Sequence, residues 1–160
     1  IGYMNSRRDG KEAPALRAKL GDPAPPLSVS DWSKRGPIDL AAGKGRNVYL
    51  IEFWATWCVQ CRGTYKHLSD LQRKHADDGL IVLGMTTEEP EVVHRFLAEF
   101  GDDLDYTVAV DDNRATYNAY MKAHRMEGYP AAFLVDRQGR VAWKGHPRAG
   151  MDEALKKLLP

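Results

Sequence analysis

Apolar residues gather in short runs of strand character that are separated by longer segments with a helical period. The clearest strand runs are 47–53 and 80–85, where β-branched, aliphatic and aromatic residues are nearly continuous. Such continuity in 80–85 is typical of a strand that is covered on both faces of its sheet. Three more strands are predicted, and the last two form a hairpin: 106–110, 131–136 and 141–144.

Helical spacing of apolar residues fills the segments between these strands. The first predicted helix follows 47–53 and ends at 77–79, and Pro90 starts the second, which ends before Gly101. Asp112 is predicted to cap a third helix, and a fourth lies at the C-terminus. The expected apolar faces consist, in chain order, of Tyr65, Leu68, Leu71, Val92, Val93, Phe96, Leu97, Phe100, Tyr117, Tyr120, Met121, His124, Ala154, Leu155, Leu158 and Leu159.

The N-terminal part of the chain has a different character. Residues 1–26 are polar and charged and end in a proline-rich stretch, which predicts a tether or arm ahead of a single domain over 27–160. Short alternating runs within 28–40 predict a hairpin that adds edge strands to the sheet. Strands and helices then alternate, which predicts an α/β fold with a central sheet and helices on both faces.

Composition and charge restrict the classes of function. A length of 160 residues fits one domain with a substantial core, and 43% hydrophobic with 28% charged residues is ordinary for a globular protein. The net charge is +1, and basic residues are interleaved with acidic ones, which argues against nucleic-acid binding. No apolar stretch approaches the roughly 18 residues of a membrane helix, so we expect no stable membrane insertion.

The two cysteines of the chain, Cys58 and Cys61, are three residues apart, directly after a predicted strand and at the start of a helix. Unpaired N–H groups and the helix dipole at such a terminus favour a thiolate, which lowers the pKa of a cysteine there. We therefore expect Cys58 to be the attacking sulfur. Cys61 lies one turn further along on the same side, where it can resolve a mixed disulfide formed at Cys58.

A zinc site is the structural alternative for a C-x-x-C pair. With no other cysteine, the two further ligands would have to be carboxylates or histidines, and no pair of these has ligand spacing. We therefore expect no metal and no cofactor. A copper-handling or non-catalytic scaffold protein remains the alternative from a different class, because Cu(I) favours paired thiolates and the chain holds five His and five Met.

The run Phe53-Trp54-Ala55-Thr56-Trp57-Cys58-x-x-Cys61 resembles the active-site segment of thioredoxins, and most of all that of extracytoplasmic TlpA/ResA-type thiol-disulfide oxidoreductases. Residues 20–25 resemble the entry to the core domain of that subfamily, and 128–136 resemble its cis-proline strand. The likeness covers roughly 20–160. It implies a thioredoxin-like fold with a central mixed sheet, an N-terminal β-hairpin extension and a helix-strand insertion at roughly 90–110.

Glu52 lies in the middle of an apolar strand, six residues before Cys58, where thioredoxins carry a buried acid behind the cysteine pair. A glutamate buried there should have a raised pKa and could exchange a proton with Cys61 during resolution. The alternative is that Glu52 points outward as the polar residue of an alternating strand. Thioredoxins often place a lysine near this acid from the next strand, but 80–88 contain none.

Pro130, read by residue type alone, marks a turn before an edge strand, and most X-Pro bonds are trans. The resemblance implies instead a cis proline that lies against the cysteine pair, with the backbone of Tyr129 pairing with the extended chain of a substrate. Many relatives have a small or β-branched residue at the position of Tyr129.

Two tryptophans precede Cys58 in residues 54–58, the cysteine loop, and both could be ordinary core aromatics. We expect Trp54 in the core and Trp57 at the surface, where it would present an apolar docking face beside Cys58. Val59 and Gln60 separate the cysteines without a histidine, which favours a reductant over a strong oxidant.

The sequence therefore predicts a thiol-disulfide oxidoreductase that reduces disulfides in other proteins and is recharged by a separate electron-donor protein. A peroxiredoxin is disfavoured because its P-x-x-x-T-x-x-C pattern has no matching proline within 51–58. We expect a monomer in the periplasm or another extracytoplasmic space. A lone cysteine pair suits the cytosol as well. Only the subfamily resemblance and the tether-like N-terminus favour an extracytoplasmic space.

Overall fold

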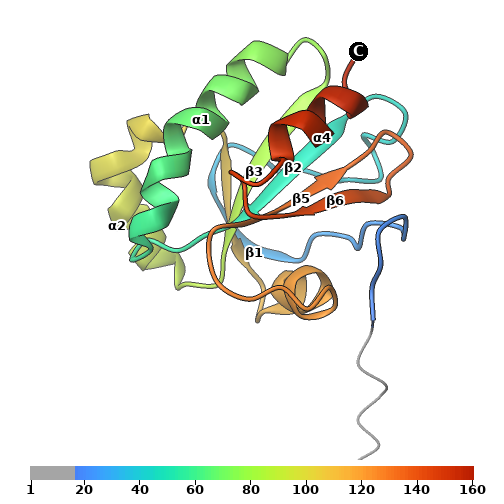
Figure 1. Ribbon diagram of the computed structural model, residues 1–160. Coiled ribbons are helices and arrows are strands. Elements are labelled where there is room, and N and C mark those ends of the chain that lie inside the picture. The colour runs from blue at the N-terminus through green and yellow to red at the C-terminus, as the bar shows by residue number, and fades with distance from the viewer. Residues whose placement is uncertain (1–16) are drawn as a thin grey trace, which may run out of the picture.

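A computed structural model of the protein describes residues 17–160, in which one six-stranded sheet lies between helices (Figure 1). The spatial order of its strands is β1-β4-β3-β2-β5-β6. In sequence order the strands are β1 (Val29–Lys34), β2 (Val48–Phe53), β3 (Leu80–Thr86), β4 (Thr107–Asp111), β5 (Ala131–Val135) and β6 (Val141–Gly145). The helices are α1 (Val59–His75), α2 (Pro90–Phe100), the 3₁₀ turn η1 (Gly101–Asp103), α3 (Ala115–Tyr117), the π-helical η2 (Asn118–Lys122) and α4 (Met151–Leu158).

The sheet is mixed, as predicted. β2, β3 and β4 run parallel to one another, whereas β5 is antiparallel to β2, β6 to β5, and β1 to β4. The insertion predicted at roughly 90–110 contains α2, and its strand β4 lies between β3 and β1. The α/β fold class predicted from the alternation of elements is therefore confirmed.

Two apolar clusters, one on each face of the sheet, form the core. Alternation along β2 separates them: Val48 and Leu50 face α1, α2 and α4, while Tyr49, Ile51 and Phe53 face η2. The expected faces of α1 and α4 are correct, since Leu68 and Leu155 are buried in the first cluster. In Figure 1, α1 and α4 lie together on one side of the sheet, and the short helical segment between β4 and β5 lies on the other.

The hairpin predicted within 28–40 is wrong in its second half. β1 forms and pairs with β4, but no strand follows it before Val48. Arg35 and Gly36 have φ values of 56° and 81°, which turn the chain out of the extended conformation, and Pro37 has no N–H to donate to a ladder. The chain instead runs across the sheet face, where Leu40 joins the η2-side cluster.

The third helix begins differently from the prediction. Two oxygens of Asp111, not Asp112, accept hydrogen bonds at its start, from the backbone N–H groups of Thr116 at 2.8 Å and Tyr117 at 2.7 Å. Asp111 is the last residue of β4 and is 95% buried, so its side chain reaches the helix start from inside the fold. The predicted single helix is a three-residue α3 followed by the π-helical η2.

The predicted arm, 1–26, lies outside the described residues up to residue 16. Further along, Gly21 donates a backbone hydrogen bond to Val141, Asp22 accepts one from Val141, and Ala24 donates one to Gly139. These bonds place residues 21–24 along β6 and the turn before it.

Asp111→Ala should destabilise the protein by about 2 kcal/mol, because two helix-start N–H groups lose a buried charged acceptor. Urea unfolding measures the change in the free energy of unfolding. Asp112→Ala is the matched control, since Asp112 is exposed, and it should shift this free energy by less than about 0.5 kcal/mol. Equal losses in the two variants would contradict the assignment of the cap to Asp111.

Candidate functional site

The two cysteines meet at the N-terminus of α1, as the sequence predicts. Cys58 is the N-cap residue, and its sulfur accepts a hydrogen bond from the backbone N–H of Cys61 at 3.2 Å. The two residues form a disulfide with their Cα atoms 5.3 Å apart. Cys58 is 5% exposed and Cys61 is fully buried, so Cys58 is the more accessible of the two. A helix terminus therefore holds a disulfide whose first cysteine is the less deeply buried of the two.

The surface around the disulfide is apolar and exposed. Trp57 is 70% exposed and Val59 is 76% exposed, on either side of Cys58. Trp54 is buried and packs against Tyr65 and Phe96, so the two tryptophans divide between core and surface as expected. Large exposed apolar side chains on both sides of a reactive group are typical of a contact surface for another molecule.

Pro130 is positioned by strand pairing. The Tyr129–Pro130 peptide is cis, as the resemblance implies, and Pro130 directly precedes β5. β5 begins at Ala131, which is paired with Phe53, the last residue of β2. Pro130 is buried, whereas Tyr129 is half-buried with its ring centroid 5.9 Å from that of Trp57. The cysteine loop and the proline loop therefore leave the same end of the sheet side by side.

Glu52 points inward. It is fully buried, and the alternation along β2 directs it to the face that α1 covers, the same face as Cys61. Burial raises the pKa of this carboxyl to about 8, against a smaller opposing effect of a hydrogen bond from Thr64. Among the described residues Oε2 has no hydrogen-bond partner. The carboxyl is therefore mostly protonated at neutral pH.

Thr64 connects Glu52 to the backbone of Cys61 and was not among the predicted site residues. Its Oγ1 lies 2.8 Å from the carbonyl oxygen of Cys61 and 3.2 Å from Oε1 of Glu52. A hydroxyl has one hydrogen and two acceptor lone pairs, so it can donate to only one of these oxygens. When Thr64 donates to Cys61, the other contact is satisfied by a protonated Glu52 that donates to Thr64. A polar residue three positions after Cys61 on the buried face of α1 is the sequence signal for this role.

Glu88, in the loop after β3, also contacts the active-site segment and was not predicted. Its Oε1 accepts a hydrogen bond from the backbone N–H of Thr56 at 2.7 Å, and its Oε2 accepts one from the Thr56 hydroxyl at 2.6 Å. Thr56 lies two residues before Cys58. The two bonds tie the cysteine loop to the loop after the neighbouring strand.

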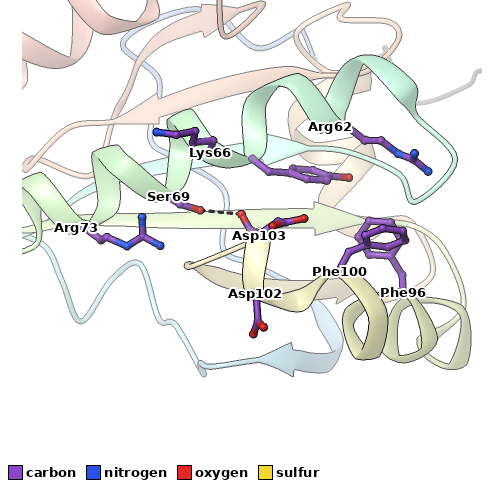
Figure 2. A pocket seen from close by; sticks show the side chains of 9 residues that line it. Arg62, Lys66, Ser69, Arg73, Phe96, Phe100, Asp102 and Asp103 are labelled. Atoms are coloured by element: carbon purple, nitrogen blue, oxygen red, sulfur yellow. Dashed lines mark hydrogen bonds between the residues drawn. The ribbon is translucent and has the colours of Figure 1, made fainter.

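A pocket on the side of the molecule that carries the insertion is separate from this site. Figure 2 shows it between α1 and the α2–η1 segment, where Ser69 donates to the carbonyl of Asp103. Neither cysteine lines it, nor do the predicted site residues. Two of its cations are paired with carboxylates, Lys66 with Asp70 and Arg73 with Asp70 and Asp105, and the third lies over an aromatic ring, Arg62 over Phe100. The pocket and the surface around Cys58 are therefore separate parts of the molecule.

Residues 17–160 contain neither a metal-binding cluster nor a membrane-spanning helix. No group of three or more His, Cys, Asp or Glu side chains is arranged to hold a metal ion in this part of the chain. Within the same residues no helix is both long and apolar enough to cross a membrane.

The cysteine loop, the cis proline and the sheet order allow comparison with known proteins. A family model described as AhpC/TSA matches residues 20–144, more than three quarters of the chain. The chain belongs to the AhpC/TSA family. The chain is 31% identical to the thiol:disulfide interchange protein HelX of Rhodobacter capsulatus over 153 residues, which are 94% of this chain and 75% of HelX.

Two further proteins are similar to this chain. The protein DipZ of Mycobacterium tuberculosis is 34% identical over 111 residues, 66% of this chain but only 15% of DipZ. A structure from Chlorobium tepidum, described as a candidate thiol:disulfide interchange protein DsbE, is 28% identical with a TM-score of 0.70, and the match covers 88% of this chain and 94% of that one. The thioredoxin-like fold and the resemblance to thiol-disulfide oxidoreductases are thus confirmed. The cysteine pair of this AhpC/TSA-family chain thus lies in a chain that is similar to proteins named for thiol:disulfide interchange.

The buried Glu52 predicts a pH-dependent stability. Its pKa of about 8 in the folded protein exceeds the ordinary value of 4.5, so between these values the unfolded chain releases a proton that the folded protein keeps. The free energy of unfolding should therefore fall as pH rises, with a slope approaching about 1.4 kcal/mol per pH unit.

Glu52→Gln removes the group that causes this fall in the free energy of unfolding. Between pH 5 and pH 8, the free energy of unfolding of the disulfide form of the variant should therefore rise by on the order of 3 kcal/mol relative to that of the original protein. Urea unfolding of the disulfide form at both pH values measures the difference. The exposed Glu99 supplies the control, because Glu99→Gln should follow the pH dependence of the original protein. If the Glu52→Gln curve runs parallel to that of the original protein, the raised pKa is contradicted.

Proposed function

We propose that the protein reduces disulfide bonds in other proteins, using the Cys58–Cys61 dithiol/disulfide couple as its redox centre. The observation that carries this proposal is the disulfide at the N-terminus of α1, with its more accessible sulfur on Cys58 and exposed apolar side chains around it. A separate electron-donor protein reopens the disulfide after each turnover.

The first step is a thiol–disulfide exchange that forms a mixed disulfide between Cys58 and the substrate. The Cys58 thiolate attacks one sulfur of the substrate disulfide, which breaks; a bond forms between Cys58 and the substrate, and the other substrate sulfur leaves with the electron pair and takes up a proton. The α1 N-terminus favours the attacking thiolate through its N–H groups, one of which already reaches Cys58 Sγ from Cys61 at 3.2 Å.

The second step releases the substrate. Cys61 loses its proton and attacks the Cys58 sulfur, so the mixed disulfide breaks and the second substrate sulfur leaves as a thiol after protonation. The sum is one substrate disulfide reduced to two thiols, and one Cys58–Cys61 dithiol oxidised to a disulfide, with two electrons and two protons transferred.

Glu52 serves as the general acid/base for Cys61 in this step. Three observations support the role: the carboxyl is fully buried, it faces α1, and burial raises its pKa to about 8. A group with a pKa near the working pH is suited both to accept and to return a proton. Thr64 orients the carboxyl through its hydroxyl.

The substrate occupies the surface between the cysteine loop and the proline loop. Trp57 and Tyr129 provide aromatic faces there, and the backbone of Tyr129 ahead of cis Pro130 pairs with an extended substrate segment. Tyr129 is bulkier than the residue that many relatives have, so the surface that the substrate meets has a different shape here.

The protein acts as a monomer in the periplasm or another extracytoplasmic space, with residues 1–26 as a tether or arm whose last part, 21–24, is bound along β6. The relatives that are named thiol:disulfide interchange proteins, HelX among them, support a protein substrate. A dithiol/disulfide couple needs no bound cofactor for these steps.

The cysteine roles are tested by single substitutions in an insulin-disulfide reduction assay. Cys58→Ser should abolish reduction, and Cys61→Ser should accumulate a mixed disulfide through Cys58, visible as a mass increase that dithiothreitol reverses. The assignment is unambiguous because the chain has two cysteines in all. Stoichiometric Cu(I) binding by the original protein, without any insulin reduction, would contradict the proposal and favour the copper-handling alternative.

The docking role of Trp57 has a separate test. Trp57→Ala should raise the KM for a protein disulfide by about tenfold, since an exposed aromatic anchor is lost, while the rate with a small aliphatic disulfide stays within about twofold. Val92→Ala is the control, because Val92 is also exposed but lies on α2. A loss of the same size with both substrates would show that Trp57 acts on the cysteines and not on docking.

A further inference from the structure

We propose that Glu88 is a positioning residue that holds the cysteine loop and, through its negative charge, makes the Cys58–Cys61 couple a stronger reductant. This inference rests on the proposed function and concerns the same site. It assigns a role in setting the redox equilibrium to a carboxylate outside the cysteine loop, in the connection between β3 and the insertion helix α2.

Glu88 is held by a closed set of hydrogen bonds. Oε1 accepts from the Thr56 N–H at 2.7 Å and from the Thr86 hydroxyl at 2.9 Å, while Oε2 accepts from the Thr56 hydroxyl at 2.6 Å. The backbone N–H of Glu88 in turn donates to the Thr86 hydroxyl oxygen at 3.3 Å. Three donors on one carboxylate fix both the side chain and the loop it contacts, and bonds to a charged acceptor are stronger than neutral ones.

Strand pairing explains why these groups meet. Phe53, at the end of β2, is paired with Met85 in β3, and the Trp54 N–H donates to the Met85 carbonyl at 3.1 Å. β2 and β3 therefore end at the same edge of the sheet. Thr56 follows Phe53 by three residues, and Glu88 follows Met85 by three residues, so both lie close to this edge. Glu88 is half-buried at this edge, so its charge is only partly screened by water.

The charge of Glu88 reaches the residues around the disulfide. Burial is the main cause that raises the pKa of both Tyr65 and Tyr129, and the charge of Glu88 adds the smallest of the effects at each hydroxyl, after Glu52 at Tyr65 and Tyr117 at Tyr129. Arg62 acts in the opposite direction at Tyr65, and Arg114 at Tyr129. Tyr65 packs on Trp54, and Tyr129 packs on Trp57. The field of this carboxylate therefore acts on both sides of the cysteine loop.

The effect on the redox couple follows from charge. Reduction of the disulfide takes up two electrons and leaves a thiolate at Cys58, which the N-terminus of α1 stabilises. A fixed negative charge on the carboxylate that binds Thr56, two residues before Cys58, opposes that thiolate, raises the pKa of Cys58 in the dithiol form and makes the reduced state less stable. A less stable reduced state gives its electrons more readily, which is the direction the proposed function requires.

Glu88→Gln tests the role of the charge, because glutamine keeps two hydrogen-bonding groups in place of the carboxylate oxygens. At equilibrium with a glutathione buffer, the variant should shift toward the dithiol by about three- to tenfold, where tenfold equals about 30 mV. The pKa of the Cys58 thiol should fall by about half a unit to one unit. Thermal unfolding of both redox forms checks that the variant is folded.

Glu89→Gln is the matched control, because it removes the same charge from the next residue. Glu89 is exposed and makes no side-chain hydrogen bond at the N-cap of α2, so the equilibrium should move by less than about twofold. Glu88→Asp is a second variant that keeps the charge, and it should remain within about twofold of the original protein even where stability falls.

The proposal is overturned if a folded Glu88→Gln leaves the equilibrium unchanged, if Glu89→Gln shifts it equally, or if Glu88→Asp shifts it as far as Glu88→Gln. These outcomes are distinct from failure of the proposed function. If the proposed function fails, neither the original protein nor the variants at position 88 would reduce insulin.

Discussion

The site depends on the pairing of β2 with a strand on each side. The parallel register Phe53 with Met85 and the antiparallel register Phe53 with Ala131 bring three chain segments to one edge of the sheet: the cysteine loop, the loop that carries Glu88, and the cis-proline loop. Because β2 is buried along its whole length, this register is fixed by the core, and a slip of one residue would exchange its two faces. The redox chemistry is thus placed by the sheet and not by the loops themselves.

The two glutamates that we propose to act on the cysteines lie in different environments. Glu52 lies behind the pair in a dry interior, where burial raises its pKa to about 8 and keeps it protonated at neutral pH. Glu88 lies at the half-buried edge of the sheet, where three hydrogen-bond donors support its carboxylate. In our account the first exchanges a proton with Cys61 and the second opposes the thiolate of Cys58. The two positions differ in burial, since Glu52 is fully buried and Glu88 is half-buried.

The sequence predicted what is encoded locally. The apolar continuity of β2 and β3, the helix that begins at Cys58, and the division between Trp54 and Trp57 all follow from neighbouring residues, and the fold class follows from their alternation. The contact between Thr56 and Glu88 joins residues 32 positions apart and has no local signal. The second strand of the predicted hairpin failed because positive φ values at Arg35 and Gly36 redirect the chain. Asp111, and not the predicted Asp112, accepts the hydrogen bonds at the start of the third helix. Burial of Asp111, which a sequence does not display, decides which carboxylate reaches these N–H groups.

The central claim is that Cys58 and Cys61 form a reversible two-electron couple of reducing character. A redox titration of the original protein against dithiothreitol or glutathione buffers, read by the mass of alkylated cysteines, tests it most directly. Our account predicts one two-electron transition with a midpoint nearer to the roughly −270 mV of a thioredoxin than to the roughly −120 mV of a strong oxidant. A midpoint at the oxidising end, or a disulfide that does not open within the range of these buffers, would contradict it.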